Sequence, residues 1–292
     1  IYLVIMIALG LLKLIGGTRF GATRWIETGL VSIQPTELAK IVIILALATY
    51  YSKNDDAPRN FSWLLKSLLI TLGIAVLIYI QPNLSNVIVT FALWASLTWI
   101  SGITIKALGI LAAVGISAII GIFPFLEQYQ KDRVFDFIYK NPEASYGATY
   151  NVQQALAALA SGGFLGKGYG LGTQTQLRFM KVRHTDFIFS VIGEEFGFIG
   201  TLFVLILIGF IIYRCFRSGR MARDTFGSLI AYGVAILILF QGSVNIAVNL
   251  NLIPVTGVPL PFISYGGSGL LSLMLGIGLV ESVVIRSKPL DF

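Results

Sequence analysis

The sequence is poor in charge and almost without cysteine and histidine. Only 12% of its 292 residues are charged, about half the share of an ordinary soluble domain, whereas 56% are hydrophobic. The one cysteine, Cys215, excludes an internal disulfide, and the one histidine, His184, excludes a metal site built from several histidines. Lipid rather than water is therefore the expected solvent for most of the chain.

An initiator methionine is also lacking, and Ile1 already lies inside an apolar run, so we expect further sequence upstream. No polar stretch is long enough for a second globular domain, and residues 1–292 are expected to form one transmembrane domain. The net charge of +7 comes mostly from cations between apolar runs, where they set orientation and meet anionic membrane lipids. Nucleic acid is therefore not an expected partner.

Long apolar runs recur along the chain. A helix needs about 20 apolar residues to cross a bilayer, and continuous runs of this kind are not strands of a barrel. The predicted fold class is therefore all-α, a polytopic membrane helix bundle with eight transmembrane spans. The expected spans cover residues 1–15, 36–51, 61–80, 84–100, 103–125, 187–213, 227–250 and 267–285.

Basic residues between the runs predict the orientation of the bundle. Segment 214–226 is short and carries four arginines against one aspartate, which predicts a cytoplasmic position. Counting spans from there places segment 52–60 and the tail after residue 285 on the same side. The outer side then holds residues 16–35, 81–83, 126–186 and 251–266.

The outer segment 126–186 is a connection of about 60 residues, and loops of such length are often functional. Within it, residues 151–160 predict a short helix and residues 161–174 a glycine-rich turn. The turn does not match a nucleotide-binding loop, because neither serine nor threonine follows Lys167 as in a P-loop. We expect a large structured loop on the outer side.

Glu37 and Lys40, in the stretch QPTELAK, lie at the start of the second span. Their spacing of three residues places them on one face of a helix as an acid–base pair. The pair fits a structural ion pair inside the bundle and, equally well, a polar cavity for a lipid head group. Arg24, shortly before this span, fits an interfacial anchor more readily than a phosphate contact, although a guanidinium suits both.

Asp186 ends the long outer loop just as the sixth span begins, after Arg183 and His184. Its position suits a helix cap, and the residue types alone favour that role. A carboxylate at the membrane edge also suits a general base or a metal ligand. Glu194 and Glu195 follow about two turns deeper, and their charges should face the bundle interior.

The stretch 249–271 contains three prolines and a Ser-Tyr-Gly-Gly-Ser run between two spans. Proline and glycine bar a regular helix there, so a structured re-entrant or hairpin loop is expected. Irregular backbone at membrane depth is tolerated only where protein or a water-filled cavity lines it. The loop is either a tight connection between helices or a wall of a substrate cavity.

Four stretches together resemble the SEDS family, which includes RodA, FtsW and SpoVE. They occur in the family's order: ATRWIETGLVSIQPTELAK (22–40), GFLGKGYGLGTQ (163–174), VRHTDFIFSVIGEEFGF (182–198) and NLIPVTGVPLPFISYGGSG (251–269). The Val-Arg before His-Thr-Asp is more similar to RodA than to FtsW. The family has ten transmembrane helices, so the resemblance implies two more upstream of Ile1, and it implies the plasma (inner) membrane of a bacterium.

The resemblance also implies an activity and partners. Its members are peptidoglycan glycosyltransferases, which join lipid II into glycan strands and release undecaprenyl pyrophosphate. They act with a class B penicillin-binding protein, the transpeptidase. For a RodA-like chain the implied role is cell-wall elongation and cell shape, and an FtsW-type role in cell division is the alternative.

Family motifs assign roles to residues of this chain. Asp186 falls on the aspartate that is essential for polymerisation. Residues at the other matching positions are implied to bind substrate: Glu37 and Lys40, which line the central cavity, with Arg24, Arg183, Gln154, Ser264 and Tyr265. The sequence departs from the family at Asn83, where an acid is usual, at Lys181, where proline is common, and at Gly269.

The mechanism expected from these assignments is displacement at the anomeric carbon of the donor. Asp186 would act as general base toward the acceptor hydroxyl, or hold a divalent cation, Mg or Mn, that aids the attack. Lys40, Arg24 and Arg183 would stabilise the lipid pyrophosphate leaving group. Two other functions fit the composition: a flippase that moves lipid II and depends on the buried charges, and a scaffold that only holds the penicillin-binding protein.

Overall fold

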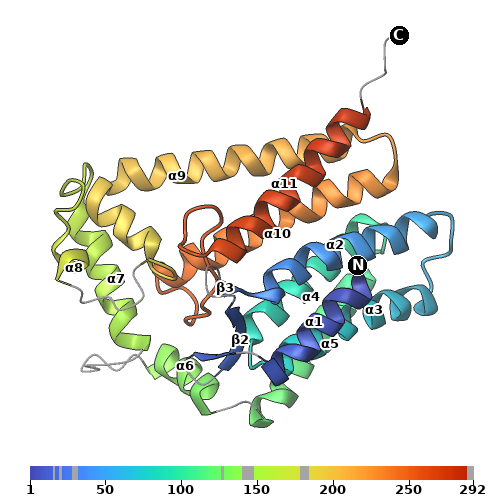
Figure 1. The fold of residues 1–292 in the computed structure, drawn as a ribbon, viewed down its shortest axis with the longest axis horizontal. Helices are drawn as coiled ribbons and strands as arrows, with labels where there is room; N and C mark the ends of the chain where they lie inside the picture. The colour runs from blue at the N-terminus through green and yellow to red at the C-terminus, as the bar shows by residue number, and fades with distance from the viewer. Residues whose placement is uncertain are drawn as a thin grey trace. The chain divides into compact units, whose positions relative to one another are not determined.

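The computed structural model describes residues 1–15, 17–19, 22–27, 32–125, 128–139, 148–177 and 184–287 (Figure 1). The chain forms two compact units. Unit one comprises Ile1–Leu108, Phe210–Phe240 and Gly266–Phe292, and unit two comprises Gly109–Gly209 and Gln241–Tyr265. Three helices begin in one unit and end in the other, so the two units are not separate domains of the chain by connectivity alone. The single transmembrane domain expected from the sequence stays a prediction.

Unit one is built mainly from helices that pack around α2. Its elements are α1 (Tyr2–Ile15), α2 (Pro35–Lys53), α3 (Phe61–Ile80), α4 (Leu84–Ile100) and α11 (Gly267–Ser287), with the first residues of α5 and parts of α9 and α10. Helix α2 contacts α1, α3, α4 and α11, and Ile43, Ile44 and Leu47 are fully buried. Helix α2 is therefore central, which keeps its polar first turns away from lipid.

Unit two holds the long connection over residues 126–186 and the ends of two long helices. Its elements are most of α5 (Ile105–Ile122), then η1 (Phe123–Phe125), α6 (Gln128–Tyr139), α7 (Ala148–Gly162), α8 (Thr173–Gln176), and parts of α9 (Ile188–Met221) and α10 (Thr225–Asn249). A buried apolar cluster joins α7, α10 and the turn before α9. Its members are Val152, Ala155 and Ala158 of α7, Phe187, and Val248 of α10.

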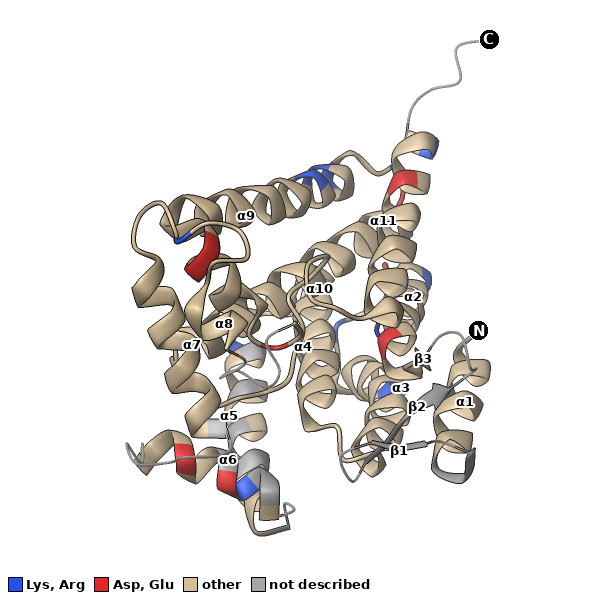
Figure 2. Cartoon of the chain, turned by 60° about the vertical axis from the view of Figure 1, so that its left-hand side comes forward, with Lys and Arg blue, Asp and Glu red and all other residues tan. Residues whose placement is uncertain are grey.

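Helices occur at all eight ranges expected to be spans, and α7 confirms the helix expected over residues 151–160. Among the described residues, four helices are long and apolar enough to cross a membrane, namely α3, α9, α10 and α11; the apolar stretches of α1 and α4 are shorter. The charges of α9 gather toward its two ends (Figure 2), and no charged residue lies between Glu195 and Arg214. The chain is therefore a multi-pass membrane protein.

A small antiparallel sheet follows α1 and was not predicted. It contains β1 (Gly17–Arg19), β2 (Ala22–Glu27) and β3 (Ser32–Ile33) in the order β1-β2-β3, with an irregular register between Gly17 and Thr18. Strands of two to six residues are too short to show the alternation of apolar and polar side chains that identifies a strand. The chain is thus predominantly helical rather than purely so.

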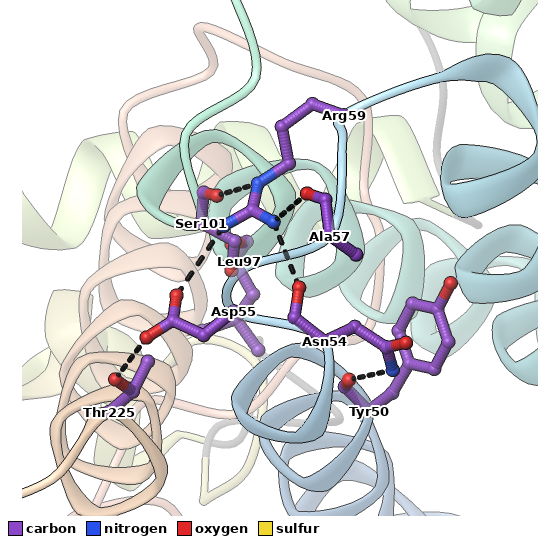
Figure 3. A network of polar contacts seen from close by, with 8 residues as sticks. All are labelled: Tyr50, Asn54, Asp55, Ala57, Arg59, Leu97, Ser101 and Thr225. Carbon is purple, nitrogen blue, oxygen red and sulfur yellow. Dashed lines mark hydrogen bonds and ion pairs between the residues drawn. The ribbon is translucent and has the colours of Figure 1, made fainter.

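A polar network at one end of unit one ties three helices together (Figure 3). The Arg59 guanidinium donates hydrogen bonds to the carbonyl oxygens of Ser101, Asn54 and Ala57 at 2.8, 2.9 and 2.7 Å. Asp55 pairs with Arg59 at 3.4 Å and accepts a hydrogen bond of 2.7 Å from the Thr225 hydroxyl. The network connects the loop after α2 to the end of α4 and the start of α10.

Replacing Arg59 by alanine should lower the thermal stability of the detergent-solubilised protein. Three carbonyl oxygens would lose a charged donor at once, a loss of roughly 1–3 kcal/mol. The measurement is the midpoint of thermal unfolding beside Arg220→Ala, which removes an exposed arginine of α9. Equal midpoints for the two variants would contradict a structural role for the network.

Candidate functional site

Asp186 lies in the turn immediately before α9, within unit two. Its side chain is half-buried, whereas the neighbouring Phe187 is 1% exposed and packs in the cluster formed with α7 and α10. The apolar ring thus anchors the turn, and Asp186 beside it is only partly buried. A partly buried carboxylate on an anchored turn suits acid–base chemistry.

Three successive carbonyl oxygens of this turn accept hydrogen bonds from α10 or from the loop that follows it. The Tyr265 amide donates to the oxygen of His184 at 2.8 Å, and the Ser264 hydroxyl donates to that of Thr185 at 2.7 Å. The oxygen of Asp186 accepts from two side-chain amides, those of Asn245 at 3.0 Å and Asn249 at 2.9 Å. The backbone under the carboxylate is therefore fixed at each residue.

Asn245 and Asn249, which we call the asparagine pair, were missed by the sequence reasoning. Both are buried on α10, four residues apart, and Asn245 also donates to the carbonyl of Val258 at 2.9 Å. Asn249 accepts hydrogen bonds from the amide and the hydroxyl of Ser190 at 3.1 and 2.6 Å, in the first turn of α9. Two amides on one face of an apolar helix were the signal that would have indicated them.

The loop after α10 forms the wall beside Asp186. Gly257 has φ +73°, and a Cβ added there would lie 3.7 Å from Oδ2 of Asp186. The Ser264 hydroxyl accepts a hydrogen bond of 2.7 Å from the Leu260 amide, while Leu260 itself is 1% exposed. The expected structured loop is thus present. Ser264 lies in it with its hydroxyl engaged by the backbone, and the Tyr265 side chain is 82% exposed.

Glu37 and Lys40 form a buried ion pair in unit one, with Nζ of Lys40 2.7 Å from Oε2 of Glu37. The backbone oxygen of Glu37 accepts a hydrogen bond of 2.6 Å from Ser272 of α11. A Cβ added at Gly269 would lie 3.6 Å from the Glu37 carboxylate, an ordinary van der Waals contact, so a small side chain would also fit beside the pair. Such a pair is retained in a bundle only when each charge is well satisfied.

Other predicted residues are distributed over both units. Gln154 is half-buried on α7 in unit two, and Arg24 lies in β2 of unit one. Asn83, the departure from the family's usual acid, caps α4 by accepting a hydrogen bond of 3.4 Å from the Asn86 amide. Arg183 and Lys181 lie outside the described residues. The structure therefore brings Ser264 and Tyr265 to Asp186, and Gly269 to the ion pair.

The described residues do not form a resident metal site. Among them, no group of three or more His, Cys, Asp or Glu side chains is placed to hold an ion. Mg²⁺ in enzymes is often held by one or two carboxylates together with substrate phosphates. A single carboxylate such as Asp186 would suit a cation that arrives with a phosphorylated substrate, and a divalent cation at Asp186 stays a prediction.

Comparison with known proteins identifies the family. The FtsW/RodA/SpoVE family model, described as cell cycle protein, matches residues 1–288. The peptidoglycan glycosyltransferase MrdB of Escherichia coli K12 is 36% identical over 294 residues, covering 100% of this chain and 78% of its own. MrdB of Helicobacter pylori is 35% identical, covering 97% and 74%. The probable peptidoglycan glycosyltransferase FtsW of Buchnera aphidicola is 37% identical, covering 93% and 68%.

Solved structures agree with the sequence relatives. A peptidoglycan synthase complex, described for its coordination of polymerization and crosslinking, contains a chain that matches 99% of this one with a TM-score of 0.81 and 29% identity. It is covered over 81% of its own length. The rod shape determining protein RodA of Thermus thermophilus matches over 99% of this chain and 78% of its own, with a TM-score of 0.69 and 28% identity.

These matches confirm the family and the glycosyltransferase class that the four motifs predicted. The chain belongs to the FtsW/RodA/SpoVE family.

Proposed function

We propose that this protein polymerises lipid II into peptidoglycan strands and releases undecaprenyl pyrophosphate, with Asp186 as its general base. The observation that carries the proposal is the fixed turn of residues 184–186. Its three carbonyl oxygens are all hydrogen-bonded, and it holds a half-buried carboxylate at the start of a long apolar helix. The glycosyltransferase relatives supply the reaction class.

The reaction requires one group that removes a proton. The acceptor sugar hydroxyl attacks the anomeric carbon of the donor, and its proton passes to the Asp186 carboxylate. A carbon–oxygen bond forms at that carbon while its bond to the pyrophosphate oxygen breaks. The pyrophosphate leaves with the bonding electrons and needs charge stabilisation rather than a proton, so that a single carboxylate is sufficient.

A fixed backbone makes this carboxylate more effective as a base. Holding a catalytic group in a near-attack geometry removes part of the entropic barrier, and a displacement of about 1 Å costs roughly a hundredfold in rate. The asparagine pair and Ser264 supply that constraint through the backbone rather than through the carboxylate. Ser264 is accordingly a positioning residue in this proposal, while the exposed Tyr265 is available to contact substrate.

Cations are proposed to stabilise the leaving pyrophosphate. The candidates from the sequence are Arg24, Arg183 and Lys40. The Lys40 charge is already compensated by Glu37 at 2.7 Å, so a phosphate would have to compete with that carboxylate. A divalent cation, Mg or Mn, bound jointly by Asp186 and the pyrophosphate, would share the same task.

The membrane setting and the partner belong to the same proposal. In this proposal the chain has eight spans and the arginine-rich end of α9 is cytoplasmic, so Asp186 is assigned to the outer face of the plasma membrane. Coordination of polymerization with crosslinking in the matching synthase complex supports a class B penicillin-binding protein as partner.

A RodA-type role in elongation is favoured by the Val-Arg before His184, although the FtsW and MrdB relatives have similar sequence identity to the chain.

A lipid II flippase is the second candidate function. It is supported by the buried Glu37–Lys40 pair, since charges inside a helix bundle often mark a transport path. A flippase should depend on this pair more than on Asp186. Lys40→Met would then abolish function while Asp186→Asn would be tolerated.

Replacing Asp186 by asparagine should abolish polymerisation. We expect a loss of roughly a hundredfold or more, because the amide keeps the shape but cannot take the proton. The measurement is strand formation from purified lipid II with a cognate penicillin-binding protein, with and without divalent cation. The control is Asp56→Asn, which changes an exposed aspartate in unit one. Full activity of Asp186→Asn would overturn the assignment.

Replacing Asn245 by alanine should lower kcat roughly ten- to a hundredfold, with little change in KM for lipid II. In the Asp186→Asn background the same change should cost almost nothing further, since residues that act as a unit are not additive. Gln241→Ala, which changes a buried polar residue about one turn earlier on α10, serves as control. An equal loss in both backgrounds would show that Asn245 only stabilises the fold.

A further inference from the structure

Helix α9 is interrupted near its outer end, and a distant part of the chain fills the interruption. Gly197 has φ 66° and ψ −160°, which breaks the helix nine residues after its start. The backbone that packs against this break belongs to residues 162–172 at and after the end of α7, here called the glycine segment. Figure 1 shows the loop after α7 adjoining the bent end of α9. Both lie in unit two.

The glycine segment binds the backbone groups that the break releases. The amides of Lys167 and Gly168 donate to the carbonyl oxygens of Glu194 and Glu195, both at 2.9 Å. In return the amides of Phe198 and Ile199 donate to the carbonyl oxygens of Gly163 and Phe164 at 2.9 and 3.2 Å. A broken helix is tolerated at membrane depth only with such internal partners.

The close approach of this backbone to α9 explains why the segment is rich in glycine, although it is not a nucleotide-binding loop. A Cβ at Gly162 would meet the carbonyl of Gly193, and one at Gly166 would meet the carbonyl of Glu195. Gly166 also has φ +81°, a conformation that favours glycine. The glycine run therefore allows two stretches of backbone to pack directly against each other.

The one charge of the glycine segment is neutralised within the structure. Nζ of Lys167 lies 3.0 Å from Oε1 of Glu194, whose side chain is fully buried. The same carboxylate accepts hydrogen bonds from the amides of Gln174 and Thr175 at 2.9 and 3.0 Å, and from the Thr175 hydroxyl at 2.8 Å. The charge of Lys167 is therefore compensated within the protein.

The outward side chains of the glycine segment are apolar. Phe164, Leu165, Tyr169 and Leu171 are 65 to 83% exposed. The Phe164 ring stacks on Phe198 of α9 with 5.8 Å between centroids, and the Tyr169 ring lies 6.2 Å from that of Phe196. Through these ring contacts, the exposed side chains of the glycine segment continue into an exposed apolar surface of α9. That surface is made by Phe196, Phe198, Ile199, Leu202 and Phe203.

We propose that the glycine segment is inserted into the lipid bilayer, at the boundary between head groups and acyl chains of the leaflet opposite the arginine-rich end of α9. Lipid is the occupant that the observations favour, because the surface continues the apolar face of a membrane helix, carries no net charge and has aromatic rings at its rim. The segment would then anchor the outer loop to the membrane ahead of Asp186. This proposal does not depend on the chemistry assigned to Asp186.

The test measures how deeply two exposed positions lie in the bilayer. Spin labels would be attached to Leu165→Cys and Tyr169→Cys in the whole protein, reconstituted in phosphatidylcholine–phosphatidylglycerol nanodiscs. Cys215→Ala removes the native thiol, which is buried. Accessibility is compared between oxygen, which concentrates in lipid, and a water-soluble nickel chelate. Phe203→Cys on α9 is the lipid reference and Arg220→Cys the aqueous reference.

Both labels should show a ratio of oxygen to nickel accessibility close to that of Phe203→Cys and several-fold above that of Arg220→Cys. A ratio like that of the aqueous reference would overturn the proposal. Low accessibility to both reagents would also overturn it, because protein would then cover the surface. Each labelled variant must match the unlabelled protein in its thermal midpoint, and the two positions provide independent readings.

Discussion

The structure depends on one constraint, that polar groups away from water must be bonded within the protein. Three sets of buried polar groups meet this constraint through contacts within the protein. The asparagine pair donates hydrogen bonds to the carbonyl oxygen of Asp186. The Glu194 carboxylate accepts hydrogen bonds from residues just after the glycine segment. Glu37 pairs with the charge of Lys40. These polar contacts connect distant parts of the sequence, whereas apolar packing alone would allow the helices to slide against one another.

The same constraint produces a site suited to chemistry at a membrane edge. The turn at residues 184–186 uses its carbonyl oxygens for structure and leaves its carboxylate half-buried. Phe187 anchors the turn from the apolar side, and the loop at Gly257 lies beside the carboxylate without a side chain in the way. In the proposed mechanism, Asp186 held in this manner takes the proton of a sugar hydroxyl whose lipid tail remains in the bilayer.

Much of this was readable from the sequence, and the failures have physical reasons. Apolar run length predicted the helices at the eight ranges expected to be spans, and four motifs predicted the family and the enzyme class. The sheet at Gly17–Ile33 was missed because its strands are too short for a period to show. Asn245 and Asn249 were missed because two amides four residues apart match no motif, and their partner Asp186 lies 59 and 63 residues away in the sequence. The glycine run was recognised, but its packing against α9 requires the fold.

The most direct test of the central claim is an experimental structure of this protein with its penicillin-binding partner and a non-hydrolysable lipid II analogue in the acceptor position. The account predicts the acceptor hydroxyl within hydrogen-bond reach of the Asp186 carboxylate, roughly 2.6–3.2 Å away or through one water. An acceptor hydroxyl bound instead at the Glu37–Lys40 pair, with Asp186 remote from both sugars, would contradict it.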